Sequence, residues 1–160
     1  MPTADTLEPV TSSQGRAELL GGLEQEVGVL VRRVRRVLIE RAHGVHPELQ
    51  SSGYLMLTWL TKHGAQRASA MTEAFGIDKG AISRQIQHLL DLGLVDRTPD
   101  PDDGRATLVS VTPDAQARIA AVGEARRAWL DASLRDWSDD ELAAIVDLLG
   151  RYNAALDARS

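Results

Sequence analysis

Polar side chains that can hydrogen-bond to a nucleic acid gather on one side of a short predicted helix that follows Asp78. The other side carries an apolar stripe within about 100° of the helix circumference, formed by Ile82, Ile86, Leu89 and Leu90. The polar side carries Gly80, Ser83, Arg84, Gln87, His88 and Asp91. Side chains of these types recognise base edges when their helix enters the major groove of DNA. Taken alone, such a face is also typical of an ordinary solvated surface helix.

A β-hairpin is predicted directly after this helix. Residues 94–97 and 107–112 are prone to form strands. In the second segment one set of alternate positions holds Leu108, Ser110 and Thr112, and the other holds Thr107, Val109 and Val111. The tip between them consists of Asp100, Pro101, Asp102, Asp103 and Gly104. We expect Pro101 to fix one φ of the turn and Gly104 to supply a permissive one. Arg105 follows the bend, where a rigid turn can hold it toward a phosphate or a narrow minor groove.

The elements around these two features predict a helix-turn-helix with a wing. A helix over about residues 49–63 is followed by a short helix that we expect Ser69 to cap and Gly76 to end. Asp78 is the predicted N-cap of the polar-faced helix, and Gly93 is its stop. A short helix, a tight link, a second helix and a hairpin form the order of a winged helix-turn-helix module.

Long amphipathic helices flank this module. Apolar residues recur at three-residue and four-residue steps from residue 18 to residue 46, which predicts one helix. Two more helices are predicted to begin at Thr112 with Pro113 and at Ser138 with Glu141. Their apolar faces exceed what one small module covers, so we expect a two-fold dimer, with an intramolecular bundle as the alternative. The predicted organisation is a mobile N-terminal arm (1–17), an N-terminal dimerisation helix (18–46), the winged module (47–112) and C-terminal dimerisation helices (113–160). The fold class is mainly α with a small β-hairpin wing.

Composition narrows the class of protein. The 160-residue chain has no cysteine, which excludes a disulfide scaffold, thiolate metal ligands and thiol redox sensing. No apolar run approaches the roughly 20 residues that span a bilayer, and the N-terminus lacks a secretion signal. We therefore expect a cytoplasmic protein without a membrane partner.

The net charge of −5 is unusual for a DNA-binding protein. The local distribution matters more than the sum, and residues 28–43 hold five arginines against one glutamate, whereas residues 62–105 hold six basic and seven acidic side chains. The predicted reading region is thus nearly neutral. We expect modest DNA affinity with a weaker salt dependence than a strongly basic module shows.

The run ISRQIQHLLDLGLVDRTPDPDDGRATLVSVT resembles the central signature of the MarR family, the multiple antibiotic resistance regulators. The matching positions are Ser83 and Arg84, Gly93 to Val95, Asp100 to Arg105, and Val111 to Thr112, with Val111 in place of the more usual leucine. The resemblance implies a dimeric transcriptional regulator, most often a repressor, that binds palindromic double-stranded operator DNA and is released by a small ligand. It places Lys79, Gly80, Ser83, Arg84 and Gln87 at the major groove and Arg105 in the minor groove.

The resemblance also implies a crevice for an aromatic or anionic effector, where Arg36, Tyr54, Trp59 or the C-terminal Trp129 would lie. The alternative, which we favour for both tryptophans, is that Trp59 and Trp129 are core residues. Arg84 is equally able to pair with a wing carboxylate such as Asp103, which would make it structural.

Other functions are less consistent with these residues. No phosphate loop, catalytic triad or convincing carboxylate pair predicts an enzyme, and no cofactor is expected. His43 and His46, with Glu48, His63 or His88, could bind a metal and make the protein a metal-sensing regulator. Asp100, Asp102 and Asp103 lack the glutamate that would complete a calcium loop. A third class is a winged-helix adaptor that binds proteins without reading DNA sequence, which the acidic balance favours.

Overall fold

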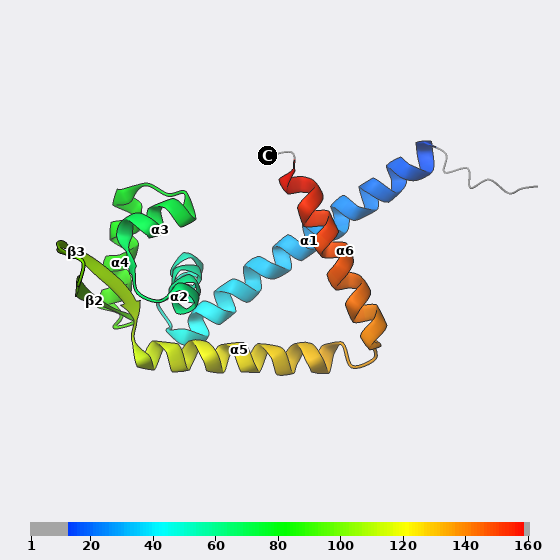
Figure 1. The fold of residues 1–160 in the computed structure, drawn as a ribbon. Coiled ribbons are helices and arrows are strands. Elements are labelled where there is room, and N and C mark those ends of the chain that lie inside the picture. Colours follow the sequence, from blue (N-terminus) through cyan, green and yellow to red (C-terminus); the bar gives the residue numbers. More distant parts are fainter. Residues whose placement is uncertain (1–12, 159–160) are drawn as a thin grey trace, which may run out of the picture. The chain divides into compact units, whose positions relative to one another are not determined.

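The computed structural model describes residues 13–158, which form six helices and three short strands (Figure 1). The order is α1 (Ser13–Val45), α2 (Ser51–His63), β1 (Gln66–Arg67), α3 (Ala68–Phe75), α4 (Lys79–Asp91), β2 (Val95–Asp100), β3 (Asp103–Val111), α5 (Pro113–Ser133) and α6 (Asp139–Asp157). The described part divides into two compact units between Ala115 and Gln116. The predicted fold class, mainly α with a winged helix-turn-helix, is confirmed.

The first helix is longer than the sequence pattern predicted. We expected a mobile arm over residues 1–17, but α1 begins at Ser13, so residues 13–17 are helical. The segment after Ser13 has no proline, and Ala17 and Glu18 are good helix formers, which explains the earlier start. Residues 1–12 lie outside the described part, and the expectation of an arm there stays a prediction.

The core of the first unit lies between α2, α3, α4 and the sheet. Its fully buried side chains come from every one of these elements and include Leu57, Leu60, Met71, Ile82, Ile86, Leu89, Val95 and Val109. The predicted stripe of α4 is thus its buried side, with Leu90 partly buried beside the others. Burial of this stripe fixes which face of α4 remains open to solvent.

Local sequence signals mark both ends of α4 and the C-terminal end of α3. Asp78 caps α4 by accepting a hydrogen bond from the amide of Ala81 at 2.9 Å, and Gly76 and Gly93 adopt left-handed φ values of 61° and 68° after α3 and α4. The prediction that Ser69 caps α3 is wrong. The N-cap is Arg67, without a side-chain cap bond, because pairing of β1 with β3 keeps the backbone extended through Arg67 and lets α3 begin at Ala68.

The sheet has a third strand that was not predicted. The order is β1-β3-β2, with all pairs antiparallel, and β1 pairs through Gln66 with Val109 and Arg67 with Leu108. β2 and β3 form the wing, which lies beside α4 in Figure 1. Both strands extend further than expected, so that Asp100 pairs with Asp103 and only two residues form the turn. Gly104 lies within β3 without a positive φ, so its predicted role as the permissive turn residue is wrong.

The second unit consists of most of α5 and α6. Thr112 accepts a hydrogen bond from the amide of Ala115 at 3.3 Å, and Pro113 opens α5, as predicted. Ser138 and Glu141 form the predicted capping box of α6, with the amide of Ser138 donating to Glu141 at 2.8 Å. No residue of α6 is buried.

Candidate DNA interface

The residues predicted to meet the major groove share the open face of α4. Lys79, Gly80, Ser83, Arg84 and Gln87 are all exposed. Gln87 donates a hydrogen bond to Asp91 at 2.8 Å, which holds its amide along the helix surface. The buried stripe on the other side of α4 prevents rotation of this face toward the core. The first two turns therefore present donors and acceptors of the kinds that recognise base edges and phosphates.

Gly80 has a steric reason to be glycine. A Cβ atom at this position would lie 3.0 Å from Oδ1 of Asp78 and 3.4 Å from Nη1 of Arg84. The same Asp78 oxygen accepts the capping bond from Ala81. The absence of a side chain at Gly80 thus leaves space for both the cap and the Arg84 guanidinium above the first turn of α4.

The wing carries Arg105 as an exposed side chain on β3, where it is the third residue after the turn. Its backbone amide donates a hydrogen bond to Oδ1 of Asp103 at 3.1 Å. Pro101, Asp102, Asp103 and Gly104 are also exposed. Arg105 is therefore an exposed cationic side chain on a strand whose backbone is held near the tip, and its contact with a minor groove stays a prediction.

Asp100 departs from its predicted place at the wing tip, because it is buried to 6% exposure. Its Oδ2 lies 2.6 Å from Nε of Arg67, and its Oδ1 accepts a hydrogen bond from the amide of Asp102 at 2.9 Å. The hydrogen bond from Arg67 is the main cause that holds the pKa of Asp100 below its ordinary range, and the same bond raises the pKa of Arg67. Burial of a carboxylate is tolerated only with such a partner.

Arg67 was not identified from the sequence. Its Nη1 lies 3.8 Å from Oδ2 of Asp103. Asp103 is therefore beside Arg67, whereas the sequence-based alternative had paired it with Arg84. A buried aspartate in a charged turn predicts some cationic partner, but Arg67 is 33 positions away from Asp100 along the chain. Only the fold brings the two together.

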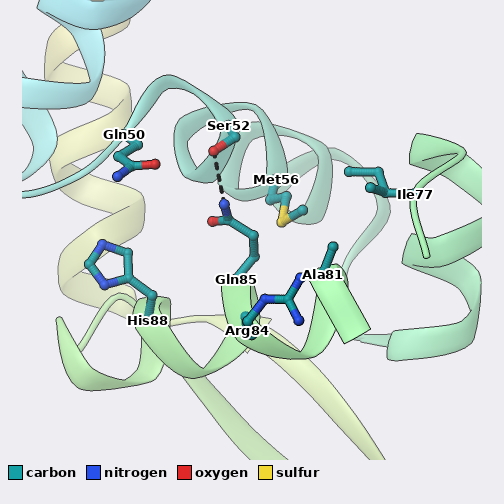
Figure 2. A pocket seen from close by; sticks show the side chains of 8 residues that line it. All are labelled: Gln50, Ser52, Met56, Ile77, Ala81, Arg84, Gln85 and His88. Carbon is teal, nitrogen blue, oxygen red and sulfur yellow. Dashed lines mark hydrogen bonds between the residues drawn. The ribbon is translucent and has the colours of Figure 1, made fainter. Parts of the chain in front are cut away.

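A cavity of about 320 Å³ lies between α2 and α4, next to Arg84 (Figure 2). It is lined by Gln50, Ser52, Met56, Ile77, Ala81, Arg84, Gln85 and His88. Gln85 donates a hydrogen bond to Oγ of Ser52 at 3.1 Å, while its Oε1 is buried without a hydrogen-bond partner. Figure 2 shows Arg84 and His88 on the α4 side and Ser52 and Met56 on the α2 side. The cavity thus combines an apolar wall with cationic and amide groups.

The residues predicted for an effector crevice do not line this cavity. Tyr54 is 5% exposed and belongs to the core, and Arg36 is exposed on α1. Trp59 is half-buried, with its ring centroid 4.5 Å from that of His63 and 5.7 Å from that of Phe75. Trp129, which we expected in the core, is 52% exposed in this chain, with the Arg126 guanidinium 4.0 Å from its ring centroid.

Three of the four histidines considered for metal binding, His46, His63 and His88, have other polar contacts. Nδ1 of His46 accepts a hydrogen bond from the amide of Glu48, Nδ1 of His63 lies 2.8 Å from the carbonyl oxygen of Trp59, and Nε2 of His88 lies 3.3 Å from that of Glu48. Within residues 13–158, no three histidine or carboxylate side chains are grouped as a metal site. None of the helices in this range is both long and apolar enough to cross a bilayer.

Comparison with known proteins identifies the family. The family model of the MarR family matches residues 49–107, which contain α2, α3, α4, β2 and the tip of the wing. The uncharacterized HTH-type transcriptional regulator YxaD of Bacillus subtilis (strain 168) is 30% identical over 133 residues, which are 83% of this chain and 92% of YxaD. The chain belongs to the MarR family.

Two further matches define the range of similarity. The HTH-type transcriptional repressor NicR of Pseudomonas putida is 28% identical over 127 residues, covering 78% of this chain and 80% of NicR. The crystal structure of a cysteine-to-serine mutant of MarR from E. coli, complexed with operator DNA, has the same fold with a TM-score of 0.61. Its sequence is 20% identical, and the match covers 82% of this chain and 93% of that one. The chain is accordingly a DNA-binding transcriptional regulator and not an enzyme.

Proposed function

We propose that this MarR-family protein is a homodimeric repressor that binds a palindromic operator and is released by a small molecule. The observation that carries the operator contact is the open polar face of α4 together with the exposed Arg105 on the wing. α4 is placed to read the major groove through Lys79, Ser83, Arg84 and Gln87, while Arg105 enters the neighbouring minor groove. The name of NicR, a repressor, supports repression over activation.

Dimerisation is supported by apolar side chains that the chain does not cover by itself. On α1 and α6 the exposed large apolar residues are Leu19, Leu20, Leu23, Leu30, Val31, Val34, Ile39, Ile145, Val146, Leu148, Leu149 and Leu156. Large apolar side chains left exposed in this number on a helix are typical of a surface that another protein covers. A second copy of the chain is the occupant we propose, and a two-fold dimer would hold two α4 helices about 34 Å apart, one DNA turn.

The cavity between α2 and α4 is the effector site that we propose, in place of the crevice around Arg36, Tyr54 and Trp59. Arg84 offers positive charge and hydrogen-bond donors, His88 offers an imidazole that can hydrogen-bond, and Met56 and Ile77 offer apolar surface. This combination suits a small aromatic carboxylate. A ligand that binds the Arg84 guanidinium withdraws it from DNA, which gives a direct route to release.

The test begins with selection of bound genomic fragments by the purified protein and continues with gel shifts on one selected operator. Arg105→Ala is expected to leave the dimer intact and to weaken binding by about 1–3 kcal/mol, with Arg127→Ala on the exposed side of α5 as a control for loss of one charge. Unchanged affinity in a folded Arg105→Ala dimer would contradict the wing contact.

The same experiment separates the regulator from the alternative adaptor. Failure to retard any fragment at both low and moderate salt would favour an adaptor that binds proteins. Sedimentation of the purified protein tests the dimer independently of DNA. Small aromatic carboxylates are then screened for release, and Arg84→Lys is expected to weaken the response to the effective one, because a lysine cannot bind a carboxylate through two parallel hydrogen bonds.

A further inference from the structure

We infer that Arg67 is a positioning residue, which holds the wing in place so that Arg105 can reach the operator. Arg67 precedes α3 and lies on β1, outside the hairpin that carries Arg105. Its guanidinium contacts two carboxylates of the hairpin, Asp100 at 2.6 Å and Asp103 at 3.8 Å. We call these three residues the wing clasp.

The two carboxylates lie on either side of the turn. Asp100 is the last residue of β2 and Asp103 the first of β3, and they face each other in the strand register. The pairing shifts between Pro99 and Asp100, so the ladder is irregular at the point where the clasp acts. One cation thus links both strands to the body of the module at the end of the hairpin where regular strand pairing is interrupted.

The clasp is connected directly to Arg105. While Oδ2 of Asp103 faces Arg67, Oδ1 of Asp103 accepts the hydrogen bond from the amide of Arg105 at 3.1 Å. A chain of polar contacts therefore leads from the start of α3 to the backbone of the arginine that we assign to the minor groove. Displacement of Arg67 would free Asp103 and, with it, the backbone at Arg105.

The outer half of the wing has little else to hold it. In β2 the four residues between Val95 and Asp100 are exposed, and in β3 the residues from Asp103 to Thr107 are exposed except for a half-buried Ala106. Asp100 is the one buried side chain at this end of the described hairpin. Two-stranded hairpins without an apolar face are barely stable in water, so an ion pair takes the place of hydrophobic packing here.

This inference rests on the proposed contact of Arg105 with DNA, and it has a competing explanation. The Arg67 side chain is 43% exposed, so it is also accessible to a DNA phosphate. The two explanations differ in the role of Asp100. If Arg67 acts on DNA directly, loss of the Asp100 charge leaves it free to do so, whereas if it acts through the clasp, loss of either partner has the same effect.

The experiment is a set of double-mutant cycles on operator affinity in the full-length protein. Arg67→Gln and Asp100→Asn are measured singly and together, each with and without Arg105→Ala, and thermal unfolding and sedimentation confirm that every variant is a folded dimer. Each clasp variant is expected to weaken binding about fivefold, and the clasp double variant no more than either single one. Arg127→Gln, which removes an exposed arginine of α5, is the matched control and should leave affinity unchanged.

The cycle with Arg105 provides the decisive comparison. In the wild-type background Arg105→Ala should weaken binding about tenfold, but only about twofold once the clasp is broken, because an arginine on a loosened wing already contributes little. Arg67→Lys, which keeps one charged contact with Asp100, should give an affinity between those of wild type and Arg67→Gln. It also serves as the test if Arg67→Gln does not fold.

Three results would overturn parts of this reasoning in different ways. If Arg105→Ala weakens operator binding as much in the Arg67→Gln background as in wild type, the clasp is refuted and the proposed function is left intact. Weaker binding by Arg67→Gln but not by Asp100→Asn assigns Arg67 to a phosphate and also refutes it. If Arg105→Ala in the wild-type background leaves operator affinity unchanged, the result instead refutes the wing contact on which the clasp depends.

Discussion

Gly53 controls how closely α2 approaches α4, and its replacement by alanine tests the packing beneath the DNA-reading face. It is a buried residue of α2 without a positive φ, so its backbone tolerates a side chain. A Cβ atom there would lie 2.7 Å from Cδ1 of Leu49 and 3.3 Å from Cδ2 of Leu89, which belongs to α4. Leu49 and Leu89 are 1% and 0% exposed, so neither can turn outward to make room.

Two effects of opposite sign set the magnitude for Gly53→Ala. Extra volume in a well-packed core destabilises by about 1–3 kcal/mol, and alanine in place of glycine in a helix stabilises by up to about 1 kcal/mol. We therefore expect a net loss of roughly 0–3 kcal/mol in the free energy of unfolding. Gly123→Ala in α5 is the matched control, because a Cβ atom there meets nothing within 4 Å and only the helix-forming gain applies.

Urea denaturation at one fixed protein concentration measures both variants, since the stability of a dimer depends on concentration. The difference between them isolates the clash, and it should be about 1–3 kcal/mol with Gly53→Ala the less stable. Operator affinity should fall in Gly53→Ala as well, because Leu89 can yield only by moving α4. If Gly53→Ala is as stable as Gly123→Ala, the spacing between α2 and α4 is not fixed by this contact, and the argument fails.

Three further predictions concern local electrostatics. Asp78→Ala removes the acceptor for the Ala81 amide and should lower the free energy of unfolding by about 1 kcal/mol. Asp78→Asn keeps the cap and should be nearly as stable as wild type in thermal denaturation. Equal losses of stability in the two variants would exclude capping as the cause. Ser138→Ala should likewise destabilise by about 1 kcal/mol, seen as a lower midpoint of helix melting by circular dichroism, and no shift would show that the capping box of α6 contributes nothing. The lowered pKa of Asp100 means that its ion pair contributes stability above the ordinary carboxyl value of 3.8, which is lost as pH falls through the lowered folded-state pKa. Between about pH 5 and pH 3, unfolding experiments should therefore show a larger loss of stability in wild type than in Asp100→Asn, and equal losses would contradict the pairing with Arg67.

Local signals in the sequence were sufficient for α4 and for the C-terminal end of α3. The Asp78 cap, the glycine stops at Gly76 and Gly93, and the buried stripe of α4 all depend on residues within a few positions of one another. Capping and amphipathic burial act over one or two turns, which is why a single sequence reveals them. Because the apolar stripe of α4 faces the core, the opposite side of the helix must face solvent.

Features that depend on distant parts of the chain were missed. β1 has two residues and exists only because β3 supplies a partner, so no strand pattern predicts it. Pairing of β2 with β3 extends the wing strands and places Gly104 in a strand, and β1 brings Arg67 beside the buried Asp100. Strand formation in so short a segment is set by its tertiary surroundings and not by its own propensity. The cavity between α2 and α4 is a tertiary feature of the same kind.

The wing clasp also changes what the acidic charge of this regulator means for DNA binding. By sequence the wing sets Asp100, Asp102 and Asp103 beside Arg105, which suggests a negative field where a phosphate must approach. In the structure Asp100 is buried against Arg67, and Asp103 lies near the same guanidinium. The fields of two opposite charges in contact largely cancel at longer range, and salt screens what remains over about 8–10 Å. The field at Arg105 is therefore less negative than the residue count indicates. A net acidic protein can bind DNA in this way with few cationic contacts, and the slope of its affinity with salt should be correspondingly shallow.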